Sequence, residues 1–135
     1  MNIIKRRRGT AIIETSKGII LTADKLKVFI LPGGGADKGE TVKDATIREI
    51  KEELGLSTTS IKYLFKLKDK PYLNDKPHKY PVDSYIEDTN YVFLVKTTGT
   101  PKPKKEIEKM VFYTQGSKIK MYKSSKEILK KFFKM

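Results

Sequence analysis

Apolar and polar residues follow several periods along the chain, and each period predicts a different element. Residues 10–15 and 19–22 are two apolar-rich runs around a polar turn at residues 16–18, which is typical of a β-hairpin. Four further strands are predicted, over residues 27–31, 60–67, 91–96 and 111–114. Residues 91–96 are apolar enough for a strand buried on both faces. The chain has no internal repeat, so these strands are expected to belong to one compact unit.

A proline-glycine segment at residues 31–35 separates the third predicted strand from a helix. Proline fixes φ and lacks an N–H donor, and glycine takes backbone angles closed to other residues. This segment is therefore predicted to be a loop whose backbone carbonyl can approach a ligand closely. Thr41 is a good N-cap, Asp44 suits the positive end of a helix, and Gly55 stands where a left-handed residue usually ends one. A helix is predicted over residues 41–54.

This predicted helix carries two stripes of opposite chemistry. Ile47, Ile50 and Leu54 form the apolar stripe, and Glu49, Glu52 and Glu53 form the acidic one. Carboxylates this close repel one another by roughly a few tenths of a kcal/mol per pair, so their clustering needs a compensating interaction. A solvated acidic face is the ordinary interpretation. Hard divalent cations take oxygen ligands, however, so the stripe is also a candidate metal site.

A second helix is predicted near the C-terminus. Ser124 and Glu127 have the spacing of a capping box. The apolar residues after them lie on one side of the helix, and they are Ile128, Leu129, Phe132 and Phe133. This side is expected to close the core. An amphipathic helix that binds a partner is the alternative.

Residues 68–87 are rich in proline, tyrosine and lysine, and they are predicted to form a long loop. A loop of this length in a small domain is usually functional or mobile. Tyr72 and Tyr80 could stack on a nucleobase while lysines hold phosphate, although tyrosines that only cover the core give the same pattern. His78, the single histidine, is expected to be a solvated loop residue.

The chain is strongly basic, with 29 Lys and Arg against 16 Asp and Glu and a formal net charge of +13. Such a field attracts polyanionic substrates and nucleic acid, although a lysine-rich surface can also reflect solubility alone. The chain has no cysteine, which excludes disulfides and thiolate metal sites. No apolar stretch is long enough to cross a membrane. Residues 1–135 are expected to form a single soluble domain in the cytoplasm.

The residues around the acidic stripe also follow a specific spacing. The constrained positions are Gly34, Glu40, Arg48, Glu49, Ile50, Glu52, Glu53, Gly55 and Leu56. A chance match at all of them has a probability on the order of 10⁻⁷ or less from average residue usage. This segment resembles the Nudix box of Nudix hydrolases, with every constrained position filled. The resemblance implies an α+β fold, a Nudix-like α/β/α sandwich with a mixed central β-sheet flanked by helices.

The same resemblance implies a reaction and a site. Nudix hydrolases cleave a nucleoside diphosphate linked to a further group X, with water attacking a phosphorus of the diphosphate in the presence of Mg²⁺ or Mn²⁺. The implied metal ligands are the Gly33 carbonyl, Glu49, Glu52 and Glu53, with Glu40 as a secondary ligand or support. The implied catalytic residues are Glu52, Glu53 and Arg48, which orients the carboxylates, together with Glu106 or Glu108 as metal ligand or base. Glu106 and Glu108 could instead merely pair with lysines.

Phosphate and base contacts are predicted at four positions. Arg8 has a planar donor fork that suits a phosphate, although a solvated basic arm at residues 6–8, before the first strand, is the alternative. Gly34, Tyr72 and Tyr80 are the other predicted substrate-binding residues. Pro71 and Tyr72 stand side by side where the family uses one or the other as a substrate signal, so this signal decides nothing.

The expected substrate is a nucleoside triphosphate, a noncanonical nucleotide, a dinucleoside polyphosphate or a nucleotide sugar. The basic charge leaves open a second reaction, the removal of pyrophosphate from the 5′ ends of RNA. A non-catalytic Nudix module that binds nucleotide or RNA is the alternative from another class. Nudix hydrolases are frequently dimers, so a homodimer is left open as well.

Overall fold

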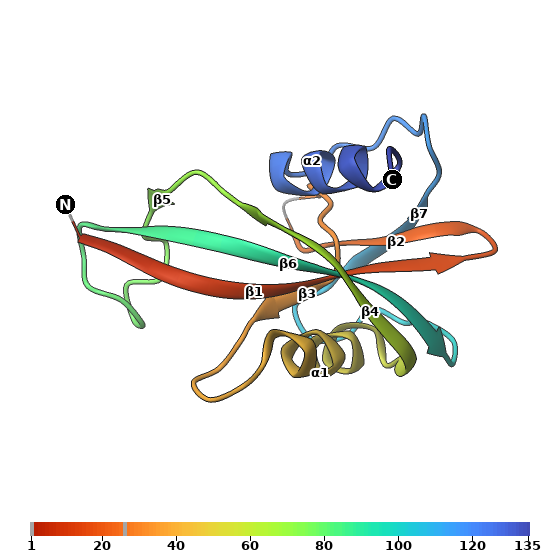
Figure 1. The fold of residues 1–135 in the computed structure, drawn as a ribbon, viewed down its shortest axis with the longest axis horizontal. Helices are drawn as coiled ribbons and strands as arrows, with labels where there is room; N and C mark the ends of the chain where they lie inside the picture. Colours follow the sequence, from red (N-terminus) through yellow and green to blue (C-terminus); the bar gives the residue numbers. More distant parts are fainter. Residues whose placement is uncertain (1, 26) are drawn as a thin grey trace.

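The computed structural model describes residues 2–25 and 27–135, and these form a seven-stranded mixed sheet with a helix on each side (Figure 1). The strands are β1 (Asn2–Thr15), β2 (Gly18–Ala23), β3 (Gly33–Gly35), β4 (Ser57–Lys68), β5 (Tyr72–Leu73), β6 (Ser84–Thr98) and β7 (Lys109–Tyr113). The helices are α1 (Val42–Leu54) and α2 (Lys123–Phe132). The sheet order is β4-β6-β1-β2-β7, with β3 beside β1 and β5 beside β6. The predicted α/β/α sandwich is confirmed.

β1 and β6 are long parallel strands that run side by side through the sheet (Figure 1). Their register pairs Asn2 with Ser84 near one end and Ile13 with Val95 near the other. The first strand was predicted to begin only at residue 10, with residues 6–8 as a basic segment before it. That prediction was wrong, because the three arginines continue β1. In the sequence, three successive arginines look like a solvated basic segment, because the strand that pairs with them, β6, lies about eighty residues further along the chain.

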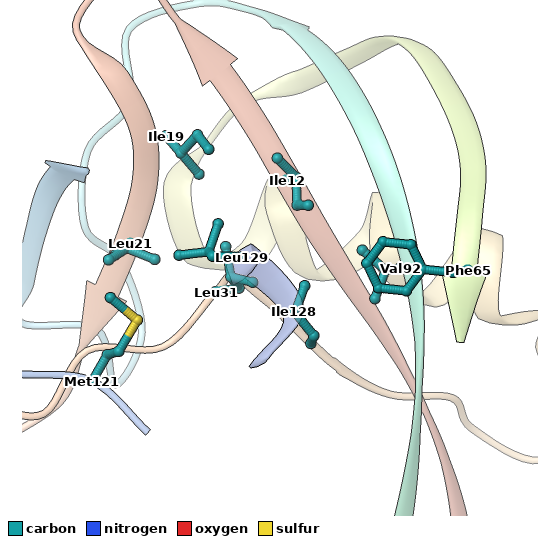
Figure 2. Close-up of a cluster of buried hydrophobic side chains, with 9 residues drawn as sticks. All are labelled: Ile12, Ile19, Leu21, Leu31, Phe65, Val92, Met121, Ile128 and Leu129. Atoms are coloured by element: carbon teal, nitrogen blue, oxygen red, sulfur yellow. The ribbon is translucent and has the colours of Figure 1, made fainter. Parts of the chain in front are cut away.

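Two clusters of buried side chains hold the two helices on opposite faces of the sheet. Ile13 and Phe93 pack on the α1 face. Their neighbours Ile12 and Val92 pack on the other face with Ile128 of α2 (Figure 2). Successive side chains of a strand point to opposite faces, so adjacent residues of β1 and β6 serve different cores. The prediction that the C-terminal helix closes the core is confirmed.

α1 begins and ends where the capping residues predicted. The Thr41 hydroxyl oxygen accepts the backbone N–H of Asp44 at 3.0 Å, and Gly55 ends the helix with a left-handed φ of 71°. The two predicted stripes are less separate than expected. Ile47 is only half-buried, whereas Glu53 of the acidic stripe is 5% exposed. The buried face of α1 therefore includes one of its carboxylates.

The glycine segment is a strand and not the predicted loop. β3 pairs antiparallel with β1, so that Gly33 lies opposite Thr10 and Gly34 opposite Gly9. A Cβ on Gly33 would clash with the carbonyl oxygen of Gly9. β1 and β3 approach closely because Gly9 and Gly33 have no side chains. In the sequence, the conformational freedom of glycine had instead favoured a loop.

α2 is attached differently from the prediction. Its N-cap residue is Tyr122, and no side chain of the described chain caps it, so the predicted capping box of Ser124 and Glu127 is wrong. The buried Ser125 hydroxyl instead accepts the backbone N–H of Leu31 at 3.0 Å. This bond joins α2 to the segment before β3. Neither helix of the described residues is long and apolar enough to span a membrane.

Two further segments differ from their predicted structure. Residues 68–87 are not one continuous loop, because they contain β5 and the first residues of β6. Residues 27–31 were predicted as a strand, but Phe29 and Ile30 make only isolated bridges, with Met121 and Thr22. Phe29 thereby lies beside Met121, just before α2, and residues 68–70 line a cavity together with the first residues of α2.

Candidate functional site

The carboxylates of α1 lie beside the glycine strand β3. The Glu49 side chain occupies the space next to Gly34, where a Cβ would lie 2.6 Å from the Glu49 Cδ. Glu53 accepts the backbone N–H of Gly33 through Oε1 at 3.3 Å. Glu52 is the more exposed of the three, with 33% of its side chain accessible. The missing side chains of the glycines thus leave room for carboxylates from the neighbouring helix.

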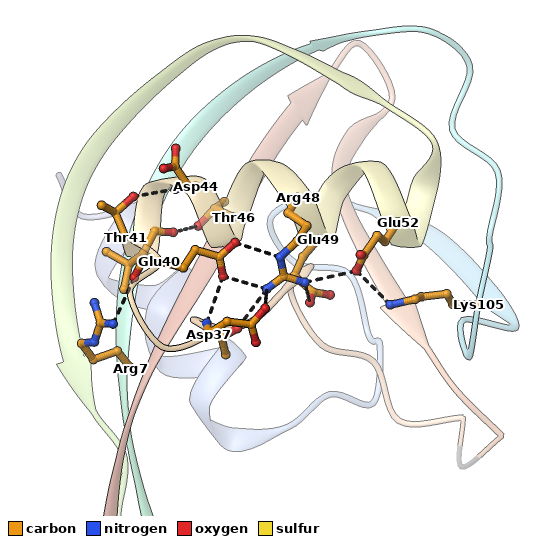
Figure 3. Close-up of polar contacts among 12 residues, drawn as sticks. Arg7, Asp37, Glu40, Thr41, Asp44, Thr46, Arg48, Glu49, Glu52 and Lys105 are labelled. Atoms are coloured by element: carbon orange, nitrogen blue, oxygen red, sulfur yellow. Dashed lines mark hydrogen bonds and ion pairs between the residues drawn. The ribbon is translucent and has the colours of Figure 1, made fainter.

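Arg48 connects the acidic residues to one another (Figure 3). Its Nε and Nη2 donate to the two Glu40 carboxylate oxygens, each at 2.9 Å. Its Nη1 donates to Glu49 Oε1 at 2.7 Å and to Glu52 Oε2 at 3.2 Å, and Nη2 also reaches the Gly35 carbonyl at 3.2 Å. The hydrogen bond from Arg48 holds the pKa of Glu40 at about 2. The guanidinium therefore fixes the orientation of three carboxyl side chains.

A lysine from the loop before β7 reaches the same cluster. Lys105 Nζ donates to Glu52 Oε2 at 2.8 Å, which is the oxygen that Arg48 also contacts (Figure 3). This bond lowers the pKa of Glu52. Lys105 was not among the predicted site residues, because the lysine-rich segment around it offers no spacing that distinguishes one lysine from another. The structure places its cation on a predicted metal ligand.

Glu53 has the most perturbed electrostatics of the cluster. Burial and then the negative charge of Glu49 raise the pKa of Glu53 to about 8, although Arg8 and the Gly33 N–H oppose the rise. The charge of Glu106 adds to the rise. Negative charge is therefore concentrated between α1 and the loop that carries Glu106, and the nearby cations compensate it only in part.

The two glutamates of the loop before β7, Glu106 and Glu108, make different interactions. Glu106 affects the pKa of both Glu53 and Lys105, so it stands beside the carboxylate cluster. Glu108 donates its backbone N–H to the Ala23 carbonyl at 2.9 Å at the entry to β7. Both glutamates line a cavity of about 290 Å³. Within residues 2–25 and 27–135, no group of three or more acidic, histidine or cysteine side chains is arranged closely enough to hold a metal ion.

A larger cavity of about 600 Å³ opens on the α2 face of the sheet. Its walls come from β1, β6, the segment after β4 and the start of α2. The lining includes Arg8, Asp69, Tyr72, Asp88, Asn90 and Lys123. Its volume suits a nucleotide-sized ligand, since small-molecule sites usually measure about 300–1,000 Å³. Tyr80 is absent from the described lining of this cavity, and His78 is exposed, as predicted.

Arg8 lies between the large cavity and the carboxylate cluster. Burial lowers the pKa of Arg8, and the charges of Glu53 and Glu49 oppose this change. Within the described chain its recorded hydrogen bond is a long one, from Nη2 to the Leu31 carbonyl at 3.5 Å. Most of its donors are therefore available to a ligand that spans the cavity and the cluster. The predicted phosphate contact needs such free guanidinium donors.

A buried ion pair forms another wall of the cavity. Arg6 Nε and Nη2 donate to the two Asp88 oxygens at 2.7 and 3.2 Å, and the Tyr72 hydroxyl donates to Asp88 Oδ2 at 3.0 Å. Asp88 is 5% exposed. Neither Arg6 nor Asp88 was among the predicted site residues. The available signal was the alternation of β6, where the polar residues Asp88 and Asn90 fall on the same face as the apolar Ile86.

Comparison with known proteins supports one family. A family model described as NUDIX domain matches residues 5–132. An RNA pyrophosphohydrolase of Ruthia magnifica subsp. Calyptogena magnifica is 42% identical over 59 residues, which are 36% of this chain and 33% of that protein. An ADP-ribose pyrophosphatase of Methanocaldococcus jannaschii is 49% identical over 49 residues, which are 33% of this chain and 29% of that protein. The matches thus span about a third of the length of these curated relatives.

Solved structures match over most of the chain. The structure of a nudix hydrolase family member from Chromobacterium violaceum is 32% identical with a TM-score of 0.76, and the match covers 97% of this chain and 78% of that one. A MutT NUDIX hydrolase from Burkholderia pseudomallei is 21% identical with a TM-score of 0.72, and the match covers 94% and 97% of the two chains. The second likeness concerns the fold alone.

Proposed function

The chain belongs to the Nudix domain family, and from this premise we propose that it hydrolyses the diphosphate linkage of a nucleoside diphosphate joined to a further group. The observation that carries the proposal is the placement of Glu49, Glu52 and Glu53 on one helix, against Gly33 and Gly34. The arrangement puts carboxylate oxygens of Glu49 and Glu53 directly against a short strand without side chains. Water is the nucleophile, so no covalent intermediate is needed.

The donor set fits a hard divalent cation. Glu49, Glu52 and Glu53 offer carboxylate oxygens, which Mg²⁺ prefers, and the Gly33 carbonyl is a further oxygen beside them. The raised pKa of Glu53 fits as well, because it reflects burial and negative charge that a cation would offset. We propose that these residues hold Mg²⁺ or Mn²⁺, with Glu40 in support. Such a cation polarises phosphoryl oxygens and lowers the pKa of bound water.

Other residues of the chain orient this machinery. Arg48 keeps Glu49 and Glu52 together through a shared nitrogen, and we assign it a positioning role. Of the two loop glutamates, Glu106 is the better placed to accept a proton from the attacking water, because its charge acts on Glu53. Glu108 lies at the strand entry and is the weaker candidate.

The large cavity is proposed to hold the nucleoside. Arg8 stands between the cavity and the carboxylates, so it can donate to a nonbridging phosphate oxygen while the nucleoside lies beyond it. Tyr72 lines the same cavity and offers an aromatic wall. The predicted role of Tyr80 receives no support from the cavity lining.

A substrate screen tests the proposal. The purified full chain is incubated with nucleoside triphosphates, oxidised nucleotides, ADP-ribose, dinucleoside polyphosphates and 5′-triphosphate RNA, with Mg²⁺ and separately with Mn²⁺. Release of pyrophosphate or nucleoside monophosphate from a small nucleotide supports the proposal. Binding without turnover across the whole panel would favour a nucleotide-binding module instead.

One observation favours RNA 5′ ends as a second candidate substrate. Lys68, Lys70 and Lys123 stand around the large cavity, and a polynucleotide leaving it would pass these cations. Hydrolysis of RNA ends should then fall steeply as salt rises, since lysine contacts to phosphate release counterions. Turnover of free nucleotides with no activity on RNA ends would reject this candidate. A cytoplasmic location and a homodimer stay predictions of the sequence.

A further inference from the structure

The large cavity is lined by a buried amide whose nitrogen has no well-formed hydrogen bond in the described part of the chain. Asn90 lies on β6, is 2% exposed and lines the cavity. Within the described residues its Nδ2 makes no hydrogen bond of good geometry, although the Asp69 carboxyl is near enough for a weak contact. A buried donor without a partner costs about 1–3 kcal/mol, so native structures rarely keep one without a reason. A ligand acceptor in the cavity would remove that cost.

The orientation of this amide is set by its neighbours. The Thr10 hydroxyl donates to Asn90 Oδ1 at 3.2 Å, which turns Nδ2 away from β1. On the other side, burial raises the pKa of Asp69, and a weak hydrogen bond from the Asn90 side chain to the Asp69 carboxyl opposes this rise. The reverse orientation would set the amide oxygen against that carboxylate. The Thr10 hydroxyl can donate or accept and so fits either orientation of the amide, whereas the Asp69 carboxylate favours an amide N–H₂ directed toward it.

Asn90 and Asp69 together present a donor beside two acceptors. The two side chains are close enough to influence each other, yet the amide nitrogen makes no hydrogen bond of good geometry to the carboxylate. Both line the cavity, and Tyr72 and Tyr122 line it as aromatic neighbours. A flat heteroaromatic ring with polar edges matches such a site, because aromatic walls hold its faces and polar groups read its edge.

We propose that this cavity is a nucleobase subsite in which Asn90 and Asp69 select guanine. Guanine has an acceptor, O6, next to two adjacent donors, N1–H and the 2-amino group. O6 would accept from Asn90 Nδ2, and the two donors would face the Asp69 carboxylate oxygens. Adenine and cytosine lack the second adjacent donor, and uracil places a carbonyl on each side of its single N–H. The assignment rests on the proposed function, since it takes the phosphates to lie past Arg8.

The test compares four substrates that differ only in the base. The values of kcat/KM are measured with Mg²⁺ for GTP, ITP, ATP and UTP. ITP lacks only the 2-amino group of GTP, so the GTP to ITP ratio reports the contact to Asp69. We expect GTP to exceed ITP by about tenfold or more, and ATP and UTP to be poorer than ITP. Equal values for all four substrates, or a preference for ATP, overturn the assignment.

Two variants separate the roles of the pair. In Asp69→Asn the GTP to ITP ratio should fall to near one, because the added amide donor opposes the amino group. In Asn90→Leu both GTP and ITP should lose about tenfold in kcat/KM while their ratio is kept, because both bases carry O6. Asp83→Asn is the matched control, since Asp83 is exposed, lies outside the cavity and has a left-handed φ of 65° that asparagine tolerates. An unchanged GTP to ITP ratio in Asp69→Asn overturns the role of Asp69.

A binding measurement keeps this assignment separate from the proposed function. GMP and IMP are titrated into the full chain by calorimetry, and thermal melting checks that each variant is folded. If no triphosphate is hydrolysed but GMP binds about tenfold more tightly than IMP, hydrolysis fails and guanine selection holds. If triphosphates are hydrolysed without base preference and GMP binds no better than IMP, guanine selection fails and the proposed reaction stands.

Discussion

Lys105 and Glu52 form a 2.8 Å ion pair between the loop before β7 and the acidic helix α1. The lysine ammonium lies on the carboxylate oxygen that Arg48 also contacts at 3.2 Å. A divalent cation that binds Glu52 has to share this oxygen with the two basic residues or displace one of them. Lys105 is the easier to displace, since half of its side chain is exposed.

Replacing Lys105 should strengthen metal binding. Lys105→Met removes a competing cation from Glu52 and keeps the aliphatic part of the side chain. An exposed ion pair contributes about 0.2–1 kcal/mol, so the Kd for Mg²⁺ should fall by up to about fivefold. Calorimetric titration of the metal-free protein measures it directly. Lys102→Met, an exposed lysine of the same loop, is the control, and weaker Mg²⁺ binding by Lys105→Met would contradict competition.

Glu53→Gln should remove most of the hydrolytic activity. The change keeps the shape of the side chain and leaves an oxygen to accept the Gly33 N–H, but it removes the carboxylate that would bind the proposed cation. Losing one electrostatic contact to the transition state typically costs about 10² to 10³ in kcat. Glu14→Gln, at an exposed position of β1, should retain activity and controls for the chemistry of the substitution. A near-normal rate for Glu53→Gln would exclude this residue from the reaction.

Gly34→Ala tests whether the glycine strand makes room for the carboxylates. The new Cβ would lie 2.6 Å from the Glu49 Cδ, so the Glu49 side chain has to move. We expect kcat/KM to fall by about tenfold or more, since small misplacements of catalytic groups are costly. The neighbouring Gly35→Ala is the comparison, because its nearest side-chain atom would be 3.7 Å away, an ordinary contact. Equal losses in both variants would show that crowding of Glu49 is not the cause.

The acidic half of the site was predictable because its signals are local. The capping residue Thr41, the terminal Gly55 and the spaced carboxylates all belong to one helix and its flanks. Within a helix, residues that are close in the sequence are also close in space. The cavity was not predictable in the same way. Arg6 and Asp88 are 82 residues apart and meet only because β1 and β6 pair in parallel. Polar residues on a buried strand face also look like loop residues until the register is known.

The pair of Arg6 and Asp88 supplies the last prediction, which concerns stability. Their side chains are 15% and 8% exposed, so removing one partner leaves the other charge buried without compensation. Arg6→Met and Asp88→Leu should each lower the free energy of unfolding by about 3–5 kcal/mol, whereas the double variant should lose far less than the sum, because it buries no charge. Equilibrium unfolding in urea measures all four proteins. Additive losses would mean that the two side chains stabilise the fold independently, and the bidentate geometry would then contribute little to holding β1 against β6.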